Sequence, residues 1–135
     1  MTEAQWQQLA DAARAASARA YCPYSAFPVG AAVLTTEGAI VSGCNVENAS
    51  SGLTVCAERN AIARAVAEGA KAIVAVAVYT PTPEPVTPCG ACRQVIAEFG
   101  SSVAIRSTCS GPDRADHTLD ELLPHGFTLP PRPAV

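Results

Sequence analysis

The stretch from Cys56 to Phe99, CAERNAIARAVAEGAKAIVAVAVYTPTPEPVTPCGACRQVIAEF, decides the fold because helical and strand patterns alternate within it. Residues 56–68 carry apolar side chains at helical spacing and precede Gly69, which predicts a helix that ends there. Residues 72–79 are apolar throughout, as in a central strand that is buried on both faces. Residues 89–99 predict a second helix. The first helix is expected to turn four apolar side chains inward: Ala61, Ile62, Ala65 and Val66.

The flanking sequence adds a helix and further strands. Residues 3–20 lack Gly and Pro and place Trp6 and several alanines at helical spacing. Residues 29–34 and 39–44 flank a short glycine-containing turn, which predicts a β-hairpin. A short strand is expected at 103–107, and a last helical turn at 119–123. This order of elements predicts an α/β sandwich with helices on both faces of a sheet.

The composition indicates one ordinary globular domain. The chain has 135 residues, of which 49% are hydrophobic and 16% charged. We expect a single domain over residues 1–135, because this length is enough to bury a core and no repeat is visible. The proline-rich end, about residues 128–135, is expected to be a flexible tail.

Charge and hydropathy exclude two kinds of partner. The formal net charge is −3 and no run of Lys or Arg is present, so we expect no nucleic-acid partner. The N-terminus has no basic segment followed by an apolar one, which argues against a secretory signal. The longest apolar stretch, residues 72–78, is too short to cross a bilayer. We therefore expect no membrane partner and a cytoplasmic protein.

Two of the six cysteines form a close pair at a predicted helix start, in the segment Pro88-Cys89-Gly-Ala-Cys92. In a cytosolic chain such spacing indicates metal binding or catalysis more often than disulfides. Side chains at i and i+3 are neighbours on a helix, so the two sulfurs can approach the roughly 3.8 Å that tetrahedral zinc requires. A helix N-terminus also favours the thiolate.

A second helix start carries Cys56-Ala57-Glu58. A third thiolate from Cys56 gives three protein ligands, which is the pattern of a catalytic zinc site whose fourth position is open. Glu58 then lies next to that position without being a ligand. The Cys-x-x-Cys pair alone also fits a structural zinc site, so a non-catalytic zinc-stabilised interaction module stays open as an alternative.

The order of the motifs, Cys-x-Glu, then 29 residues, then Pro-Cys-x-x-Cys, resembles the zinc-dependent nucleobase and nucleoside deaminases. Four segments narrow the likeness to the small homotetrameric cytidine deaminases, and the likeness runs from about Trp6 to Phe127. It implies a three-layer α/β/α sandwich with a mixed sheet of about five strands. The segments are Tyr24–Ala32 (YSAFPVGAA), Gly43–Ser50 (GCNVENAS), Cys56–Ile62 (CAERNAI) and Pro88–Gln94 (PCGACRQ).

The resemblance implies hydrolytic deamination of cytidine and 2′-deoxycytidine, with one Zn²⁺ per subunit held by Cys56, Cys89 and Cys92. Glu58 is implied as the residue that moves protons. Three thiolates and Zn²⁺ together carry a charge of −1, so positive charge is required nearby. Arg59 is implied to donate to the ligand sulfurs, and the two helix N-termini add to its effect.

The resemblance also implies the substrate contacts of the first two motifs. Phe27 would stack on the pyrimidine ring. Asn45 and Glu47 would hydrogen-bond the 3′-hydroxyl of the ribose, while the backbone of Val46 holds the loop between them. A small-molecule nucleoside is therefore the expected partner.

Three further contacts follow from the same resemblance. The Ala57 N–H would bind the base carbonyl, and the Thr87 carbonyl would receive the departing amine. Phe127 would reach the site of a neighbouring subunit in a homotetramer whose sites lie near subunit interfaces. Ser51 stands where the family often has an aromatic residue, and Asn60 where it usually has Thr.

Several residues are expected to have plain structural roles. Cys22, Cys44 and Cys109 are expected to be small buried apolar side chains. His117 and His125 lie outside every ligand motif. The nearest alternative activity is that of blasticidin S deaminase or a related aminopyrimidine-nucleoside deaminase, which shares the zinc pattern.

Overall fold

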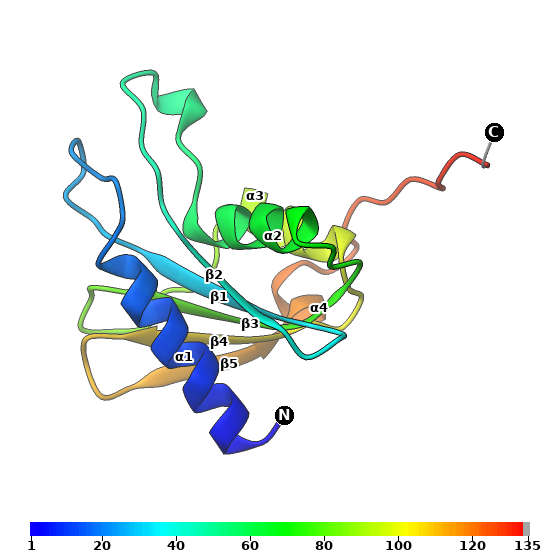
Figure 1. The fold of residues 1–135 in the computed structure, drawn as a ribbon, viewed down its shortest axis with the longest axis horizontal. Helices are drawn as coiled ribbons and strands as arrows, with labels where there is room; N and C mark the ends of the chain where they lie inside the picture. Colours follow the sequence, from blue (N-terminus) through cyan, green and yellow to red (C-terminus); the bar gives the residue numbers. More distant parts are fainter. Residues whose placement is uncertain (134–135) are drawn as a thin grey trace.

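The computed structural model describes residues 1–133 and contains a five-stranded sheet with helices on both faces (Figure 1). The strand order is β2-β1-β3-β4-β5. The elements in chain order are α1 (Glu3–Ser17), β1 (Gly30–Thr35), β2 (Ile40–Cys44), η1 (Ser51–Leu53), α2 (Ala57–Ala67), β3 (Ile73–Thr80), α3 (Gly90–Glu98), β4 (Ala104–Cys109), β5 (Arg114–Thr118) and α4 (Leu119–Leu122).

The sheet is mixed, as expected. Strand β1 pairs antiparallel with β2 and β3, β3 pairs parallel with β4, and β4 pairs antiparallel with β5. The β1–β2 hairpin turns at Gly38, whose φ of 90° suits glycine. The parallel β3–β4 pair requires a crossover, and α3 supplies it.

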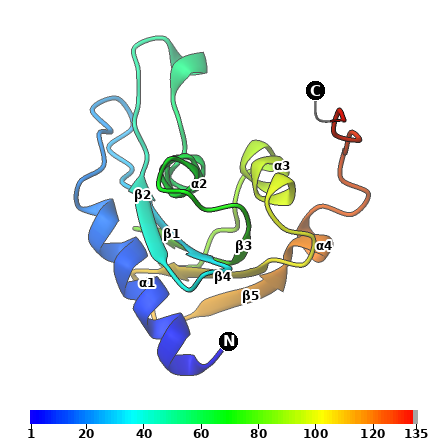
Figure 2. The ribbon, with the colours of Figure 1, turned by 45° about the vertical axis from the view of Figure 1, so that its right-hand side comes forward.

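Helix α1 covers one face of the sheet, and α2 and α3 cover the other (Figures 1 and 2). Alternate residues of β3 enter the two cores, because successive strand side chains point to opposite faces. Ala75 and Ala77 pack with Trp6 and Leu9 of α1. Larger side chains of β3, including Val76, pack on the opposite face against α2 and α3. The predicted three-layer α/β/α sandwich is confirmed.

The pattern of residues did not predict strand β5, although the family resemblance implied about five strands. Its sequence, Arg-Ala-Asp-His-Thr, has no apolar alternation, and its residues are alternately exposed and half-buried. An edge strand pairs on one side only, and polar side chains on it are ordinary. Pairing with β4 makes this segment a strand.

Two expectations for the helices are wrong in detail. Helix α1 ends at Ser17 and does not reach Ala20. Val66 of α2 is 45% exposed, whereas Ala61, Ile62 and Ala65 are buried. The buried stripe of α2 also includes Ala57 and Glu58, so the inward face is centred away from Val66, which lies just beyond its edge.

Residues 128–133 have no helix or strand and are exposed. The rest of the expected tail, residues 134–135, lies outside the described residues. None of the helices described in residues 1–133 is long and apolar enough to cross a membrane.

Candidate zinc centre and substrate cleft

Three cysteine sulfurs meet where the N-termini of α2 and α3 face each other. Cys56 is the N-cap of α2, Cys89 is the N-cap of α3, and Cys92 lies in the first turn of α3. The three Sγ atoms all lie within 4.8 Å of one another, and those of Cys56 and Cys89 are 4.0 Å apart. Neither N-cap side chain bonds the backbone of its own helix, so both sulfurs are available as ligands.

This donor set fits zinc. Tetrahedral coordination with Zn–S bonds of about 2.3 Å places two sulfurs about 3.8 Å apart. Since three thiolates so close together repel one another, a divalent cation among them is the natural partner. Cys56, Cys89 and Cys92 form the zinc-binding site of the chain, as the sequence predicted.

Hydrogen bonds already favour a thiolate at Cys56. The bond from the Cys92 thiol, with a second from the Arg59 guanidinium, lowers the pKa of Cys56 to about 5. Nη2 of Arg59 lies 3.5 Å from Cys56 Sγ and 3.4 Å from the Thr54 carbonyl oxygen. Donating to Cys56 and being buried both raise the pKa of Cys92. Arg59 is therefore the side-chain cation that contacts the metal ligands directly.

Glu58 lies in the first turn of α2 and is only 4% exposed. Burial raises the pKa of its carboxyl group. Burial thus favours the protonated form of this carboxyl group, which is the direction in which a carboxyl group is tuned for general acid–base catalysis. Glu58 lines the same cleft as the zinc ligands Cys56 and Cys89.

A cleft of about 370 Å³ opens beside the cysteines, which is within the usual size of small-molecule sites. Its walls come from the loop before β1, the loop after β2, the start of α2, strand β3 and the segment before α3. Most residues that the sequence predicted for the site line it: Phe27, Asn45, Glu47, Cys56, Ala57, Glu58, Thr87 and Cys89.

Asn45 and Glu47 fix the loop that carries Phe27. Asn45 Oδ1 accepts from the Val29 N–H at 2.9 Å, and Asn45 Nδ2 donates to the Phe27 carbonyl at 2.9 Å. Glu47 accepts from the Ser25 hydroxyl and from the Ser25 N–H. The hydroxyl bond lowers the pKa of Glu47, so this carboxylate is ionised at neutral pH.

Sequence reasoning missed this role of Ser25, whose hydroxyl also accepts from the Phe27 N–H at 3.1 Å. The only signal was its place inside the Tyr24–Ala32 motif, since Ser25 and Glu47 are 22 residues apart. Val46 pairs through its backbone with Val55, and both N–H···O distances are 2.9 Å. This pairing attaches the loop after β2 to the segment before Cys56.

Other predicted residues lie away from the cleft. Phe127 is 69% exposed and does not line it. Ser51 is exposed in η1. Cys109 is buried as expected, but Cys22 and Cys44 are only half-buried, which corrects that expectation.

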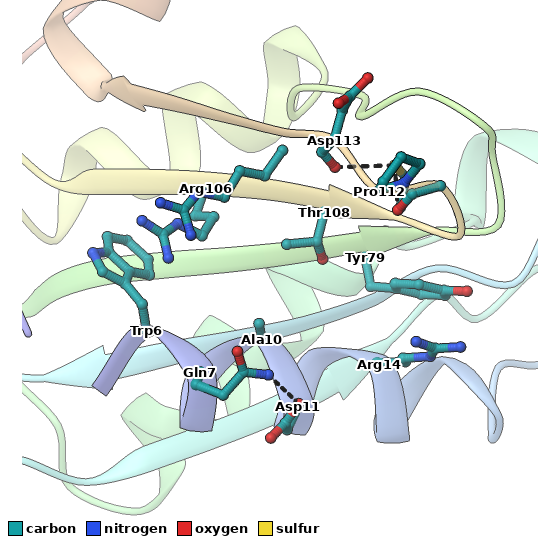
Figure 3. A pocket seen from close by; sticks show the side chains of 13 residues that line it. Trp6, Gln7, Ala10, Asp11, Arg14, Tyr79, Arg106, Thr108, Pro112 and Asp113 are labelled. Carbon is teal, nitrogen blue, oxygen red and sulfur yellow. Dashed lines mark hydrogen bonds between the residues drawn. The ribbon is translucent and has the colours of Figure 1, made fainter. Parts of the chain in front are cut away.

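A second hollow, of about 200 Å³, lies on the opposite face of the sheet, between α1 and the turn from β4 to β5 (Figure 3). Some of its polar side chains already have partners: Gln7 donates to Asp11 within the hollow, and Arg106 donates to Asp116 and Glu3 outside it. Figure 3 shows Arg106 beside the ring of Trp6. The hollow contains none of the groups expected for the reaction.

The α/β/α fold, with three thiols and a buried glutamate at two facing helix starts, defines a zinc-dependent deaminase. Residues 3–107 match the family described as the cytidine and deoxycytidylate deaminase zinc-binding region. The chain belongs to the cytidine deaminase family.

Known relatives cover most of the chain. The cytidine deaminase of Sporosarcina psychrophila is 46% identical over 123 residues, which are 90% of each chain. That of Halalkalibacterium halodurans is 50% identical over 111 residues, covering 81% of this chain and 83% of the relative. The crystal structure of cytidine deaminase from Burkholderia pseudomallei superimposes with a TM-score of 0.87 at 45% identity, covering 94% of this chain and 100% of the other.

Proposed function

We propose that this protein hydrolyses cytidine and 2′-deoxycytidine to uridine and 2′-deoxyuridine, with release of ammonia. One observation carries the proposal: the three-cysteine cluster, buried Glu58, and the residues Phe27, Asn45 and Glu47 border one cleft. The cysteine cluster and Glu58 suit the chemistry of deamination, whereas Phe27, Asn45 and Glu47 suit the binding of a base and a ribose. Relatives named cytidine deaminase support cytidine as a substrate.

Glu58 is assigned the proton transfers. Zinc, when bound by the three thiolates, acts as a Lewis acid that makes water a nucleophile at neutral pH. Glu58 carries both protons of the attacking water in turn: it passes the first to N3 of the pyrimidine and, after the C4–O bond has formed, passes the second from that oxygen to the amine that leaves as ammonia. Its burial supports this assignment, because burial raises the pKa of the carboxyl group and so makes it a better proton acceptor than an exposed glutamate.

The remaining cleft residues are assigned to orientation. The ring of Phe27 stacks on the pyrimidine, and the Ala57 N–H binds the base carbonyl. Glu47 and Asn45 bind the 3′-hydroxyl, for which an ionised carboxylate is a good acceptor. The Thr87 carbonyl accepts from the departing amine.

Arg59 is assigned to the metal ligands. Its contact with Cys56 offsets part of the negative charge of three thiolates. The N-termini of α2 and α3 act in the same direction, because both point their free N–H groups toward the cluster.

We further propose one domain over the chain and a homotetramer with sites near subunit interfaces. Exposed apolar side chains support the tetramer: Tyr24 is 64% exposed, Leu53 64% and Val86 45%, and Val86 lines the cleft itself. Phe127 is assigned to a neighbouring subunit's site. A cytoplasmic location stays a prediction from the sequence.

Ultraviolet absorbance of the purified, metal-analysed protein tests the substrate. Cytidine and 2′-deoxycytidine are expected to be converted to the uracil nucleosides with release of one ammonia each, and blasticidin S to be converted much more slowly. Turnover of blasticidin S without turnover of cytidine would show the alternative activity. Tight zinc without turnover of any of these compounds would indicate a non-catalytic zinc module.

A further inference from the structure

Arg93 follows the zinc ligand Cys92 in α3 and donates hydrogen bonds from three different nitrogens. Nε donates to the Pro88 carbonyl at 2.7 Å, Nη1 to the Leu122 carbonyl at 2.8 Å, and Nη2 to the Thr87 hydroxyl at 2.9 Å. The planar guanidinium keeps these donors in a fixed arrangement, which a single ammonium group cannot reproduce.

One of these acceptors lies in the wall of the cleft, and a second lies between two residues of that wall. Thr87 lines the cleft, and Pro88 immediately precedes the zinc ligand Cys89. The preceding loop contains Pro81, Pro83 and Pro85, which have no N–H to donate. Within residues 1–133, no backbone–backbone hydrogen bond connects residues 83–88 to another segment. Apart from the packing of fully buried Pro88, the hydrogen bonds found for Thr87 and Pro88 in residues 1–133 are therefore the two from Arg93.

The third acceptor connects the cleft to the C-terminal part of the chain. Leu122 is the last residue of α4. The next residue of α3, Gln94, donates to the Phe127 carbonyl at 2.9 Å. Two consecutive residues directly after the zinc ligand thus attach the segment from α4 to Phe127 to helix α3.

The charge of Arg93 supports the same role. Its three acceptors are neutral, and none of the ion pairs found among residues 1–133 includes it. A cation without a carboxylate partner, bonded to the residues just before Cys89, adds positive potential near the thiolates. Arg93 thus places a positive charge against the residue that precedes the ligand Cys89.

We propose that Arg93 is a positioning residue for the deamination. It fixes Thr87, Pro88 and the adjoining ligand Cys89 relative to α3, and it ties this wall to α4. The expected effect of Arg93 on kcat rests on the proposed function. The expected effect of Arg93 on the metal site does not depend on which substrate the protein uses.

Three variants test the proposal. R93Q removes the charge and most of the donors, and we expect kcat for cytidine to fall about 10- to 100-fold, as for other residues that support metal ligands. R93K keeps the charge but lacks the planar donors, so its kcat should lie between those of R93Q and wild type. The matched control is R64Q, because exposed Arg64 also donates to a carbonyl, that of Ser42, far from the cleft. Its kcat should stay within about twofold of wild type.

Two readouts separate positioning from a general loss of stability. Cobalt-substituted protein is expected to show shifted thiolate charge-transfer bands in R93Q and R93K but not in R64Q. In a double-mutant cycle, T87V and R93Q are expected to be non-additive in kcat, since they remove the two ends of one bond.

The proposal is overturned if R93Q has wild-type kcat and unchanged cobalt bands. If R93Q does not fold, unchanged bands and wild-type kcat in R93K overturn it equally. A wild-type protein that fails to deaminate cytidine would contradict the proposed function instead, and the cobalt bands would still decide whether Arg93 positions the site.

Discussion

Arg59 and Arg106 carry the same functional group on opposite faces of the sheet, and their surroundings differ. Arg59 of α2 donates to Cys56, three residues before it, and to the Thr54 carbonyl. Arg106 of β4 bonds Asp116 and Glu3 and lies 4.6 Å from the centre of the Trp6 ring. Arg59 contacts a thiol of the metal site, whereas Arg106 contacts carboxylates that Arg114 also pairs with.

This difference indicates that the two faces of the sheet have different roles. The face under α2 and α3 contains the cleft, the metal ligands and the buried acid. The face under α1 packs alanines of the helix and sheet with larger side chains such as Trp6 and Leu9, and Arg106 is its buried cation. We therefore expect changes on the first face to alter catalysis and changes on the second to alter stability.

The largest effect is expected from removing the metal. Chelation of zinc, or the substitution C92S, should abolish deamination, because the thiolates then have no cation to present to water. Metal analysis and the ultraviolet assay on the same sample check this. Reloading zinc should restore the activity of the chelated protein. Full activity in a zinc-free sample would contradict the assignment of catalysis to the metal-binding face.

A smaller loss is expected from R59Q. Without the guanidinium, the ligand cluster is more negative, and kcat should fall about 10- to 100-fold. The measurement is kcat together with zinc affinity. The matched substitution R106Q on the other face should leave kcat close to that of wild type, and a similar loss of kcat in both variants would contradict the comparison.

R106Q is expected to act on folding instead. The guanidinium is 6% exposed and forms ion pairs with Asp116 and Glu3, so its loss should lower the free energy of unfolding by about 2 kcal/mol. Denaturant unfolding of the zinc-loaded protein measures this change. An unchanged free energy of unfolding would show that the ion pairs of Arg106 do not contribute to stability.

The smallest effect concerns pH. The hydrogen bond from Arg106 lowers the pKa of Asp116 below 3.8, its ordinary value. The unfolded chain then binds the proton more tightly, so this contribution to stability is present above pH 3.8 and is lost as the pH falls through the lower folded pKa. D116N removes this titrating group, so the free energy of unfolding should fall less steeply below about pH 4 than in wild type. The difference should be small, because Asp116 is half exposed. Parallel curves for D116N and wild type would contradict this.

The same contrast explains which parts were predictable from the sequence. Helices α2 and α3 and strand β3 have strong local patterns, and the cysteine cluster follows from residues at two helix starts. Strand β5 has no apolar alternation, so only its pairing with β4 reveals it.

Contacts between distant residues were not predictable for the same reason. The bonds from Ser25 to Glu47, from Arg93 to Leu122 and from Arg106 to Glu3 join residues 22, 29 and 103 positions apart. Spacing rules within a helix or strand do not apply over such separations. These contacts depend on the arrangement of the elements in space.

The central claim is that the metal and Glu58 act together in one cleft, and E58Q tests it most directly. The side chain keeps its size and loses its ability to carry a proton, and it is not one of the three zinc ligands. Zinc content and thermal unfolding should match wild type, while kcat for cytidine falls about 10²- to 10⁴-fold. Wild-type turnover by zinc-loaded E58Q would contradict the account.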